Sequence, residues 1–219
     1  PKPLIEIGEL SLIEIHLLRL AAAGYERVII NLHHLGELIR GKLGDGRRYG
    51  LQIIYSEEPE QALETAGGIV NALDKIRSQR FAAISADVLC DYSITALNAS
   101  AGCSPALGHL VMVNNPGHHP RGDFALDTEN FLLSTQDNTD LEGFTFSGIA
   151  WFDRALFQSL EPGKRALRPV LEAAIRSRQL SGELHSGLWS DIGTLQRLDQ
   201  ARESAAVGAY IDSVRQSIS

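Results

Sequence analysis

Two aspartates stand where carboxylate chemistry is readily built. Asp87 follows the apolar run 81–85 (FAAIS), and Asp191 follows a second apolar run that ends at Trp189. We expect both runs to be buried strands, and ligands of open α/β sheets bind outside the carboxyl ends of the strands. Two carboxylates from distant parts of a chain suit Mg²⁺, which takes one or two of them together with substrate phosphates. Each aspartate alone could instead cap the turn or helix that follows it, so the hypothesis depends on the pair.

A pair of glycines is the second feature that could serve a ligand. The segment 63–69 (LETAGGI) places Gly67 and Gly68 where a loop enters a predicted helix. Without side chains at these positions, backbone amides at the start of the helix can approach a ligand closely. A tight loop-to-helix turn explains the same pair, and for an isolated glycine pair this structural interpretation is favoured.

Composition limits the classes of function. The chain has 219 residues, of which 44% are hydrophobic, enough to bury a substantial core in a single α/β domain. Its 20 Lys and Arg oppose 27 Asp and Glu, and the net charge of -7 argues against a general nucleic-acid binder. No run approaches the ~20 apolar residues of a membrane span, and no signal peptide is recognisable. Cys90 and Cys103 form no metal or redox spacing, which predicts reduced thiols in a cytoplasmic protein.

The elements that must position these residues alternate in the first half of the chain. Apolar residues at helical spacing predict helices, and short β-branched runs predict buried parallel strands. The expected helices cover residues 11–23, 35–43 and 68–76, and the expected strands cover 27–31, 51–55 and 81–85. This alternation implies right-handed crossovers and a parallel sheet covered by helices on both faces.

The second half of the chain has a different rhythm. Strands are predicted over 109–114, 124–127 and 144–152 with no long helix between them, so this half is expected to extend or cap the sheet. Helices are then predicted over 154–160 and 167–178, a strand over 183–189 and a helix over 194–206. No internal repeat or low-complexity linker interrupts the sequence, which favours one domain over residues 1–219.

Six segments, taken in order, resemble the sugar-1-phosphate nucleotidyltransferases. They are PKPLI (1–5), LETAGGI (63–69), SADV (85–88), NPGHHPRGDF (115–124), FTFSGI (144–149) and GLWSDIGT (187–194). The Pro-Lys-Pro and strand-end Asp motifs are shared across the superfamily. The His-His-Pro and Phe-Ser-Gly-Ile segments are similar to the branch of uridylyltransferases that use N-acetylmuramate 1-phosphate.

The resemblance implies a fold and a reaction. The implied fold is the three-layer, Rossmann-like nucleotide-diphospho-sugar transferase fold, with a mostly parallel sheet and helices on both faces. In the implied reaction, UTP and a sugar 1-phosphate give a UDP-sugar and pyrophosphate. The sugar phosphate that the resemblance favours is N-acetylmuramate 1-phosphate, and the implied pathway is cell-wall sugar recycling. A sugar phosphate oxygen would attack the nucleotide α-phosphorus in line, so positioning and charge neutralisation would carry the rate. Mg²⁺ is the expected cofactor, no nucleic acid or membrane partner is expected, and the oligomeric state is left open.

The resemblance also implies roles for residues that match the family motifs. Asp87 and Asp191 would hold Mg²⁺, and Lys2 would contact the phosphates, so these three form the expected catalytic set. Lys2 and Asp87 would also belong to the nucleotide site. There Glu64, Gly67 and Gly68 would line the uracil and the ribose.

Four further residues are implied on the sugar side. Ser147 and Gly148 would face the sugar. Asn115 and Asp123 are weaker candidates, because their loop would border the same cleft.

The sequence also departs from the family pattern. A strand and a glycine-rich loop that precede Pro-Lys-Pro in the family are not found, so the domain is expected to be N-terminally incomplete. Ala66 and Ala86 stand where relatives usually have glycine, and a methyl group there could crowd the nucleotide. Three alternatives therefore stay open: a nucleotidyltransferase for mannose, glucose or heptose 1-phosphate, a catalytically inactive nucleotide-sugar-binding paralogue, and a glycosyltransferase of related fold. The last is disfavoured because Asp87 and Asp91 lack the Asp-x-Asp spacing.

Overall fold

The computed structural model describes residues 1–58, 61–103 and 105–216, and the chain divides into two compact units. Unit 1 consists of Pro1–Glu60, Ser85–Ile94 and Leu188–Ser219. Unit 2 consists of Gln61–Ile84 and Thr95–Gly187. Each unit has its own hydrophobic core, and each is described by itself below.

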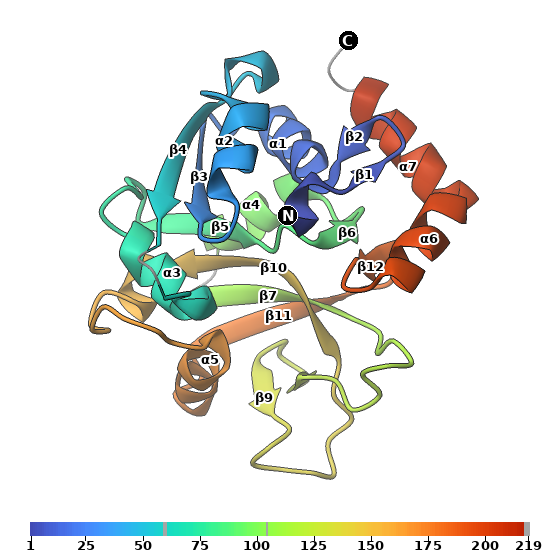
Figure 1. Ribbon diagram of the computed structural model, residues 1–219. Helices are drawn as coiled ribbons and strands as arrows, with labels where there is room; N and C mark the ends of the chain where they lie inside the picture. Colours follow the sequence, from blue (N-terminus) through green and yellow to red (C-terminus); the bar gives the residue numbers. More distant parts are fainter. Residues whose placement is uncertain (59–60, 104, 217–219) are drawn as a thin grey trace. The chain divides into compact units, whose positions relative to one another are not determined.

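Unit 1 combines short two-stranded sheets with helices. Its elements are η1 (Lys2–Leu4), β1 (Glu6–Ile7), β2 (Leu10–Ser11), α1 (Leu12–Ala22), β3 (Arg27–Leu32), α2 (Gly36–Leu43), η2 (Arg47–Tyr49), β4 (Gln52–Glu57), β6 (Val88–Cys90), β12 (Trp189–Asp191), α6 (Leu195–Glu203) and α7 (Ala205–Gln216), where η marks a 3-10 helix. Strands β3 and β4 pair in parallel, whereas β1 pairs with β2 and β12 with β6 in antiparallel fashion. Helix α1 packs against α7 (Figure 1).

Helix α1 is the centre of the core of unit 1. Leu12, Ile15 and Leu17 are at most 1% exposed. The helix begins after Ser11, whose backbone N and Oγ both donate to a carboxylate oxygen of Glu14, at 3.1 and 2.6 Å. This reciprocal capping satisfies donors at the start of the helix and fixes where α1 begins.

Unit 2 is built around one mixed sheet. Its elements are α3 (Glu64–Ala72), β5 (Arg80–Ile84), α4 (Ile94–Cys103, whose first residue belongs to unit 1), β7 (Gly108–Val113), β8 (Phe124–Leu126), β9 (Leu132–Ser134), β10 (Thr145–Asp153), η3 (Arg154–Leu156), α5 (Leu167–Arg176) and β11 (Leu180–His185). The four-stranded sheet has the order β11-β7-β10-β5 (Figure 1). Strand β11 is parallel to β7, and β10 is antiparallel to both β7 and β5.

The core of unit 2 lies between this sheet and the helices α3 and α5. Leu110 and Met112 of β7 are fully buried. Phe152 of β10 meets Phe157 edge to face, with 5.4 Å between the ring centroids. Leu171, Ala174 and Ile175 of α5 belong to the same cluster, so one face of the helix covers the sheet.

The α/β class is confirmed, but the sheets are small and mixed, whereas one mostly parallel sheet was expected. The reason lies in residues 109–152, where no long helix separates the strands. A parallel pair needs a crossover of a dozen or more residues, usually a helix, whereas consecutive strands without one return antiparallel. The β8–β9 hairpin and β10 follow this rule.

Several boundaries also differ from the expected ones. The strand expected over 183–189 is two strands, β11 in unit 2 and β12 in unit 1, separated at Ser186 and Gly187. The helix expected over 194–206 is α6 followed by α7, and the helix expected over 154–160 is only the short η3, ahead of Pro162 and Gly163. Helix α4 and strands β1, β2, β6 and β9 were not predicted. The helix expected over 68–76 is α3, which begins at Glu64, so Gly67 and Gly68 lie inside the helix and not in a loop before it.

None of the described helices is long and apolar enough to cross a membrane.

His16 is an ionisable group in the apolar core of unit 1. It lies on α1 and is 5% exposed. The pKa of its imidazole is lowered to about 3, mainly by burial and also by the nearby charge of Arg19, against an opposing contribution from the Val88 backbone. His16 is therefore neutral in the folded protein at neutral pH.

Replacing His16 should flatten the dependence of stability on pH. The folded-state pKa is below the unfolded value, so the unfolded chain binds the extra proton between about pH 6.5 and pH 3, and stability is lost as the pH falls through this window. Between pH 7 and pH 5, His16 should cost about 2 kcal/mol of unfolding free energy. Urea unfolding at both pH values should show this loss in the parent protein and lack it in His16→Leu. An equal loss in both proteins would contradict the prediction.

Candidate active site

The two predicted metal ligands lie beside one antiparallel strand pair of unit 1: Asp87 directly precedes β6, and Asp191 ends β12. Strand β12 pairs with β6 so that Asp191 is opposite Val88, and the backbone N of Ile192 donates to the backbone O of Asp87 at 2.8 Å. Both aspartates are half-buried. The structure thus brings together two carboxyl-bearing residues that are far apart in the sequence.

This pairing is anchored by the core of unit 1. Leu89 of β6 is fully buried and Ile192 is 1% exposed, and both belong to the cluster formed around α1. The ladder continues past the strands, where the backbone N of Asp91 donates to the backbone O of Leu188 at 3.1 Å. Apolar burial on both sides of the pair therefore fixes the register in which the aspartates are held.

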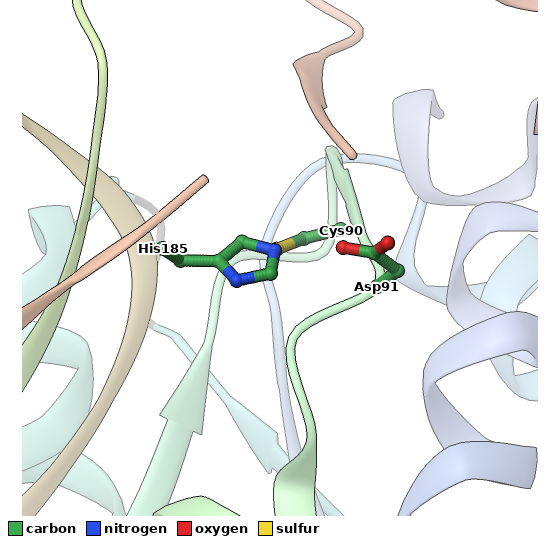
Figure 2. Close-up of side chains that lie close together, drawn as sticks. All are labelled: Cys90, Asp91 and His185. Atoms are coloured by element: carbon green, nitrogen blue, oxygen red, sulfur yellow. The ribbon is translucent and has the colours of Figure 1, made fainter. Parts of the chain in front are cut away.

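Cys90 closes β6, and Asp91 follows it (Figure 2). The Cys90 thiol is buried and free, and burial raises its pKa to about 11, so it is protonated at neutral pH. The Tyr210 hydroxyl donates to the Cys90 carbonyl at 2.9 Å, which ties α7 to β6. A structural thiol fits these facts better than a nucleophile. His185, also drawn in Figure 2, ends β11 of unit 2. The side chain of the second cysteine, Cys103, lies outside the described part of the chain.

The Asp191 carboxylate is held by Arg197. The guanidinium Nη1 of Arg197 lies 2.8 Å from Oδ2 and 3.0 Å from Oδ1 of Asp191. Thr194 caps α6, and its Oγ1 accepts a hydrogen bond from the backbone N of Arg197 at 3.2 Å. A positive group therefore sits directly on one of the two predicted metal ligands.

Lys2 is exposed in η1 at the edge of the same unit. Its carbonyl accepts the backbone N–H of Ile5 at 2.9 Å, and Leu4 and Ile5 pack on the unit 1 core that also buries β6. This core fixes the backbone of Lys2 and leaves its ammonium group in solvent.

Gly67, the first glycine of the pair in α3, packs against neighbouring backbone and does not face open space. A Cβ on Gly67 would lie 2.3 Å from the carbonyl O of Gly163 and 3.2 Å from the backbone N of Arg165. The backbone N atoms of Ala66 and Gly67 both donate to the Arg165 carbonyl at 3.1 Å. A ligand that used these first-turn amides would have to replace their hydrogen bonds to the Arg165 carbonyl. The need for glycine at position 67 is explained by its close packing against Gly163.

Two neighbours of this pair also have local roles. Ala66 is fully buried in the core of unit 2, so its methyl group points into that core. Glu64 begins α3 with a φ of 60°, a left-handed conformation unusual for a non-glycine residue. Its carboxylate lies 3.4 Å from Nζ of Lys164. Gly68 is buried in the same turn.

Asn115 and Asp123 form a polar clamp in unit 2. The Asn115 amide donates to the carbonyls of Gly143 and Pro120 at 2.7 and 3.2 Å, and its Oδ1 accepts from Thr145 Oγ1 at 2.9 Å. Asp123 Oδ2 accepts the backbone N–H of Phe146 at 2.9 Å.

Arg168 of α5 completes the clamp. Its guanidinium pairs with Asp123 Oδ1, and Nε2 of His119 lies 3.3 Å from the same oxygen. The clamp therefore ties the 115–124 loop to β10 and α5. Its polar groups are used mostly inside the protein.

Ser147 and Gly148 sit in a bulge of β10. The pairing of β10 with β7 shifts between Phe146 and Ala150, and Gly148 has a φ of 84°, which favours glycine. The buried Ser147 Oγ accepts the backbone N–H of Ile149 at 3.1 Å. Bulges of this kind re-aim backbone groups next to active sites, so the predicted sugar-side role fits the local geometry.

Comparison with known proteins places this geometry in a family. The family model described as nucleotidyl transferase matches residues 1–122. An N-acetylmuramate alpha-1-phosphate uridylyltransferase of Neisseria meningitidis is 41% identical over 213 residues, covering 96% of this chain and 90% of the relative. The chain belongs to the nucleotidyl transferase family.

Two further comparisons describe the breadth of this similarity. A mannose-1-phosphate guanylyltransferase of Mycobacterium tuberculosis is 30% identical over 206 residues, covering 89% of this chain and 55% of the relative. A crystal structure of a candidate glucose-1-phosphate thymidylyltransferase from Bacillus anthracis, in complex with sucrose, matches with a TM-score of 0.78. It is 17% identical and covers 96% of this chain and 87% of the matched chain, which supports the nucleotidyl transferase fold.

The nucleotidyl transferase motifs are thus divided between the units. Lys2, Asp87 and Asp191 belong to unit 1, and the glycine pair and the four sugar-side residues belong to unit 2. Sequence reasoning missed Arg197 and Arg168, which hold Asp191 and Asp123. One signal for Arg197 was readable, because a cation in the first turn of a helix opposes the helix dipole.

Gly67→Ala should destabilise the protein if Gly67 is required by packing. The new Cβ would lie 2.3 Å from the Gly163 carbonyl, so the backbone of α3 or of its neighbour must move, at a cost of about 1–3 kcal/mol. Gly117→Ala is the matched control, since nothing lies within 4 Å of a Cβ there. Urea unfolding should show the loss only in Gly67→Ala. Unchanged stability with weakened UTP binding would instead support a direct ligand role.

Proposed function

We propose that this member of the nucleotidyl transferase family transfers a uridylyl group from UTP to N-acetylmuramate 1-phosphate. The products are the UDP-sugar and pyrophosphate. The observation that carries this proposal is the β6–β12 pairing, which brings the backbones of Asp87 and Asp191 together in a chain 41% identical to an N-acetylmuramate alpha-1-phosphate uridylyltransferase. Two carboxylates at strand ends form the donor set that a nucleotide-bound magnesium ion requires.

The donor set fits Mg²⁺. Asp87 and Asp191 supply hard carboxylate oxygens, which are the ligands Mg²⁺ prefers. The Asp191 carboxylate already pairs with a cationic group, the guanidinium of Arg197 at 2.8 Å, which supports its assignment as a cation ligand. A bound Mg²⁺ supplies neutralisation of the charge that builds on the phosphates during transfer.

The chain's own residues bind and orient the substrates. Lys2, exposed on a backbone fixed by the unit 1 core, offers an ammonium group to the triphosphate. Its positive charge stabilises the negative charge that develops on the pyrophosphate as it leaves. The sugar phosphate oxygen attacks the α-phosphorus in line. Most of the rate comes from this positioning, because phosphoryl transfer asks little covalent chemistry of the protein.

Unit 2 contributes the recognition groups. Glu64, Gly67 and Gly68 are proposed on the uracil and ribose side, with Ser147 and Gly148 on the sugar side. The bulge between Phe146 and Ala150 changes the pairing of β10 with β7, and Gly148 adopts a φ of 84° within it. The polar clamp of Asn115 and Asp123 keeps the neighbouring loop in one shape.

A second candidate is a nucleotidyltransferase for mannose, glucose or heptose 1-phosphate. The observation that favours it is the 30% identity to a mannose-1-phosphate guanylyltransferase. We place the reaction in the cytoplasm and in cell-wall sugar recycling, in line with the free Cys90 thiol expected of a reducing compartment.

Substrate choice is tested by measuring pyrophosphate release in Mg²⁺ while UTP, GTP and TTP are crossed with a panel of sugar 1-phosphates. Release should be fastest with UTP and N-acetylmuramate 1-phosphate. Release confined to GTP and mannose 1-phosphate would establish the second candidate. Calorimetric binding of UTP without turnover of any sugar would instead identify a nucleotide-binding paralogue.

Asp87→Asn and Asp191→Asn should each reduce turnover by at least about 100-fold, since each removes a metal ligand and with it several kcal/mol of charge stabilisation. Side-chain volume is nearly unchanged, so the thermal unfolding midpoint should stay close to that of the parent. Asp199→Asn is the matched control, because Asp199 is an exposed carboxylate on α6 of the same unit. Normal turnover in either variant would remove that aspartate from the site.

A further inference from the structure

The ion pair between Arg197 and Asp191 occupies the carboxylate that the proposed reaction assigns to the metal. One guanidinium nitrogen lies between the two carboxylate oxygens, 2.8 Å from Oδ2 and 3.0 Å from Oδ1. Both side chains are partly exposed, 23% for Arg197 and 30% for Asp191. A water-borne ion can therefore reach the pair without unfolding of the strands.

The local chain is shaped to allow this contact. Gly193 lies between the two partners, and a Cβ there would be 2.3 Å from Nη2 of Arg197. Thr194 then caps α6 and places Arg197 in its first turn, with the backbone N of Arg197 donating to Thr194 Oγ1. The guanidinium folds back over Gly193, whose missing side chain leaves the space.

The stability of α6 does not explain a cation at this position. The start of a helix carries a partial positive charge, so Arg, Lys and His⁺ are unfavourable in the first turn and favourable in the last. Arg197 is in the first turn, and a partly exposed ion pair contributes little to folding. The structure thus places Arg197 against the charge preference of the helix start and onto the Asp191 carboxylate.

We propose that Arg197 is a displaceable counter-ion of Asp191 that links the binding of the divalent cation to the binding of the nucleotide. The inference rests on the proposed function, in which Asp191 is a metal ligand. A guanidinium is always protonated, so it and a divalent cation compete for the same two oxygens. The metal must separate the pair, and Arg197 therefore weakens binding of the metal alone.

The nucleotide removes this penalty. Once released, the guanidinium has a new partner in the phosphates of the nucleotide, for which arginine is well suited because it donates hydrogen bonds in a planar fork. Metal and nucleotide then bind cooperatively, and each raises the affinity for the other by the same factor. Arg197 acts in the proposed reaction as a residue that couples the two ligands.

The test measures binding of Mn²⁺, as a probe for Mg²⁺, by electron paramagnetic resonance with and without UTP and in the absence of any sugar phosphate. In Arg197→Gln, Mn²⁺ alone should bind at least about 5-fold more tightly than in the parent, and most of the enhancement by UTP should be lost. Arg202→Gln is the matched control, because it removes the same charge from α6 while Arg202 contacts only the Glu6 carbonyl among the partners recorded for it. Both Mn²⁺ constants should be unchanged in this control.

Two outcomes separate this inference from the proposed function, and one further variant supports the test. Equal or weaker binding of Mn²⁺ alone in Arg197→Gln, with loss of Mn²⁺ binding in Asp191→Asn, would overturn the inference and leave the metal ligand in place. Unchanged Mn²⁺ binding in Asp191→Asn would overturn both. Arg197→Lys keeps the charge but not the planar fork, so it should retain weak binding of Mn²⁺ alone and lose part of the enhancement by UTP. This variant decides the question if Arg197→Gln fails to fold.

Discussion

The antiparallel pairing of β6 with β12 is the constraint on which the candidate site depends. It is a short ladder, three residue pairs extended by the bond from Ile192 N to Asp87 O. A ladder of this length has little stability of its own. The burial of Leu89 and Ile192 in the unit 1 core stabilises the strand pair beyond what its few hydrogen bonds provide. A slip by one residue would move Ile192, directly after β12, out of this core, so the position of Asp191 is set by the apolar packing of the next residue.

The segment after β12 shows how closely one stretch of chain can combine unlike requirements. Asp191 ends the strand, Gly193 gives room, Thr194 caps α6, and Arg197 returns to Asp191. The pair stabilises the fold by only about 0–1 kcal/mol, because it is partly exposed. An ion pair that takes little free energy to separate is suited to exchange, in which a metal ion replaces Arg197 at the Asp191 carboxylate. A fully buried pair would cost far more to separate.

The sequence predicts the parts of this protein that local patterns encode. Helix α1, with its regular apolar spacing, and β3, with its β-branched run, lie within one or two residues of their expected ranges. The split of the expected strand 183–189 was not predictable from periodicity, because the break at Ser186 and Gly187 reflects two partners, β7 and β6, in different units. Pairing between distant strands is decided by tertiary packing, which a single sequence does not display.

The predicted site residues divide along the same line. Strand ends and family motifs predict Asp87 and Asp191 as metal ligands, because carboxylates at strand ends carry a positional signal. The structure brings the backbones of these two residues together, and their metal-binding role stays a prediction. Gly67 was read as a position for ligand approach, yet its neighbour is the Gly163 carbonyl, and that contact depends on a loop distant in sequence. Arg197 was missed although its signal, a cation at the start of a helix, is local. Rules of helix electrostatics thus deserve the same weight as motif matches when a site is sought in a sequence.

The polar clamp of unit 2 changes how specificity for the sugar is best understood. Both amide hydrogens of Asn115 are donated to backbone carbonyls, and the Asp123 carboxylate binds a backbone amide, Arg168 and His119. A sugar hydroxyl that took either side chain as its partner would have to replace bonds already made, with no net gain in hydrogen bonding. In the proposed sugar-side assignment, these residues would therefore act through the shape of the 115–124 loop, which their hydrogen bonds hold. Selectivity on this side would then follow from the fit of the sugar to a fixed backbone, so a change to the clamp would alter which sugars fit more than how tightly any one hydroxyl is held.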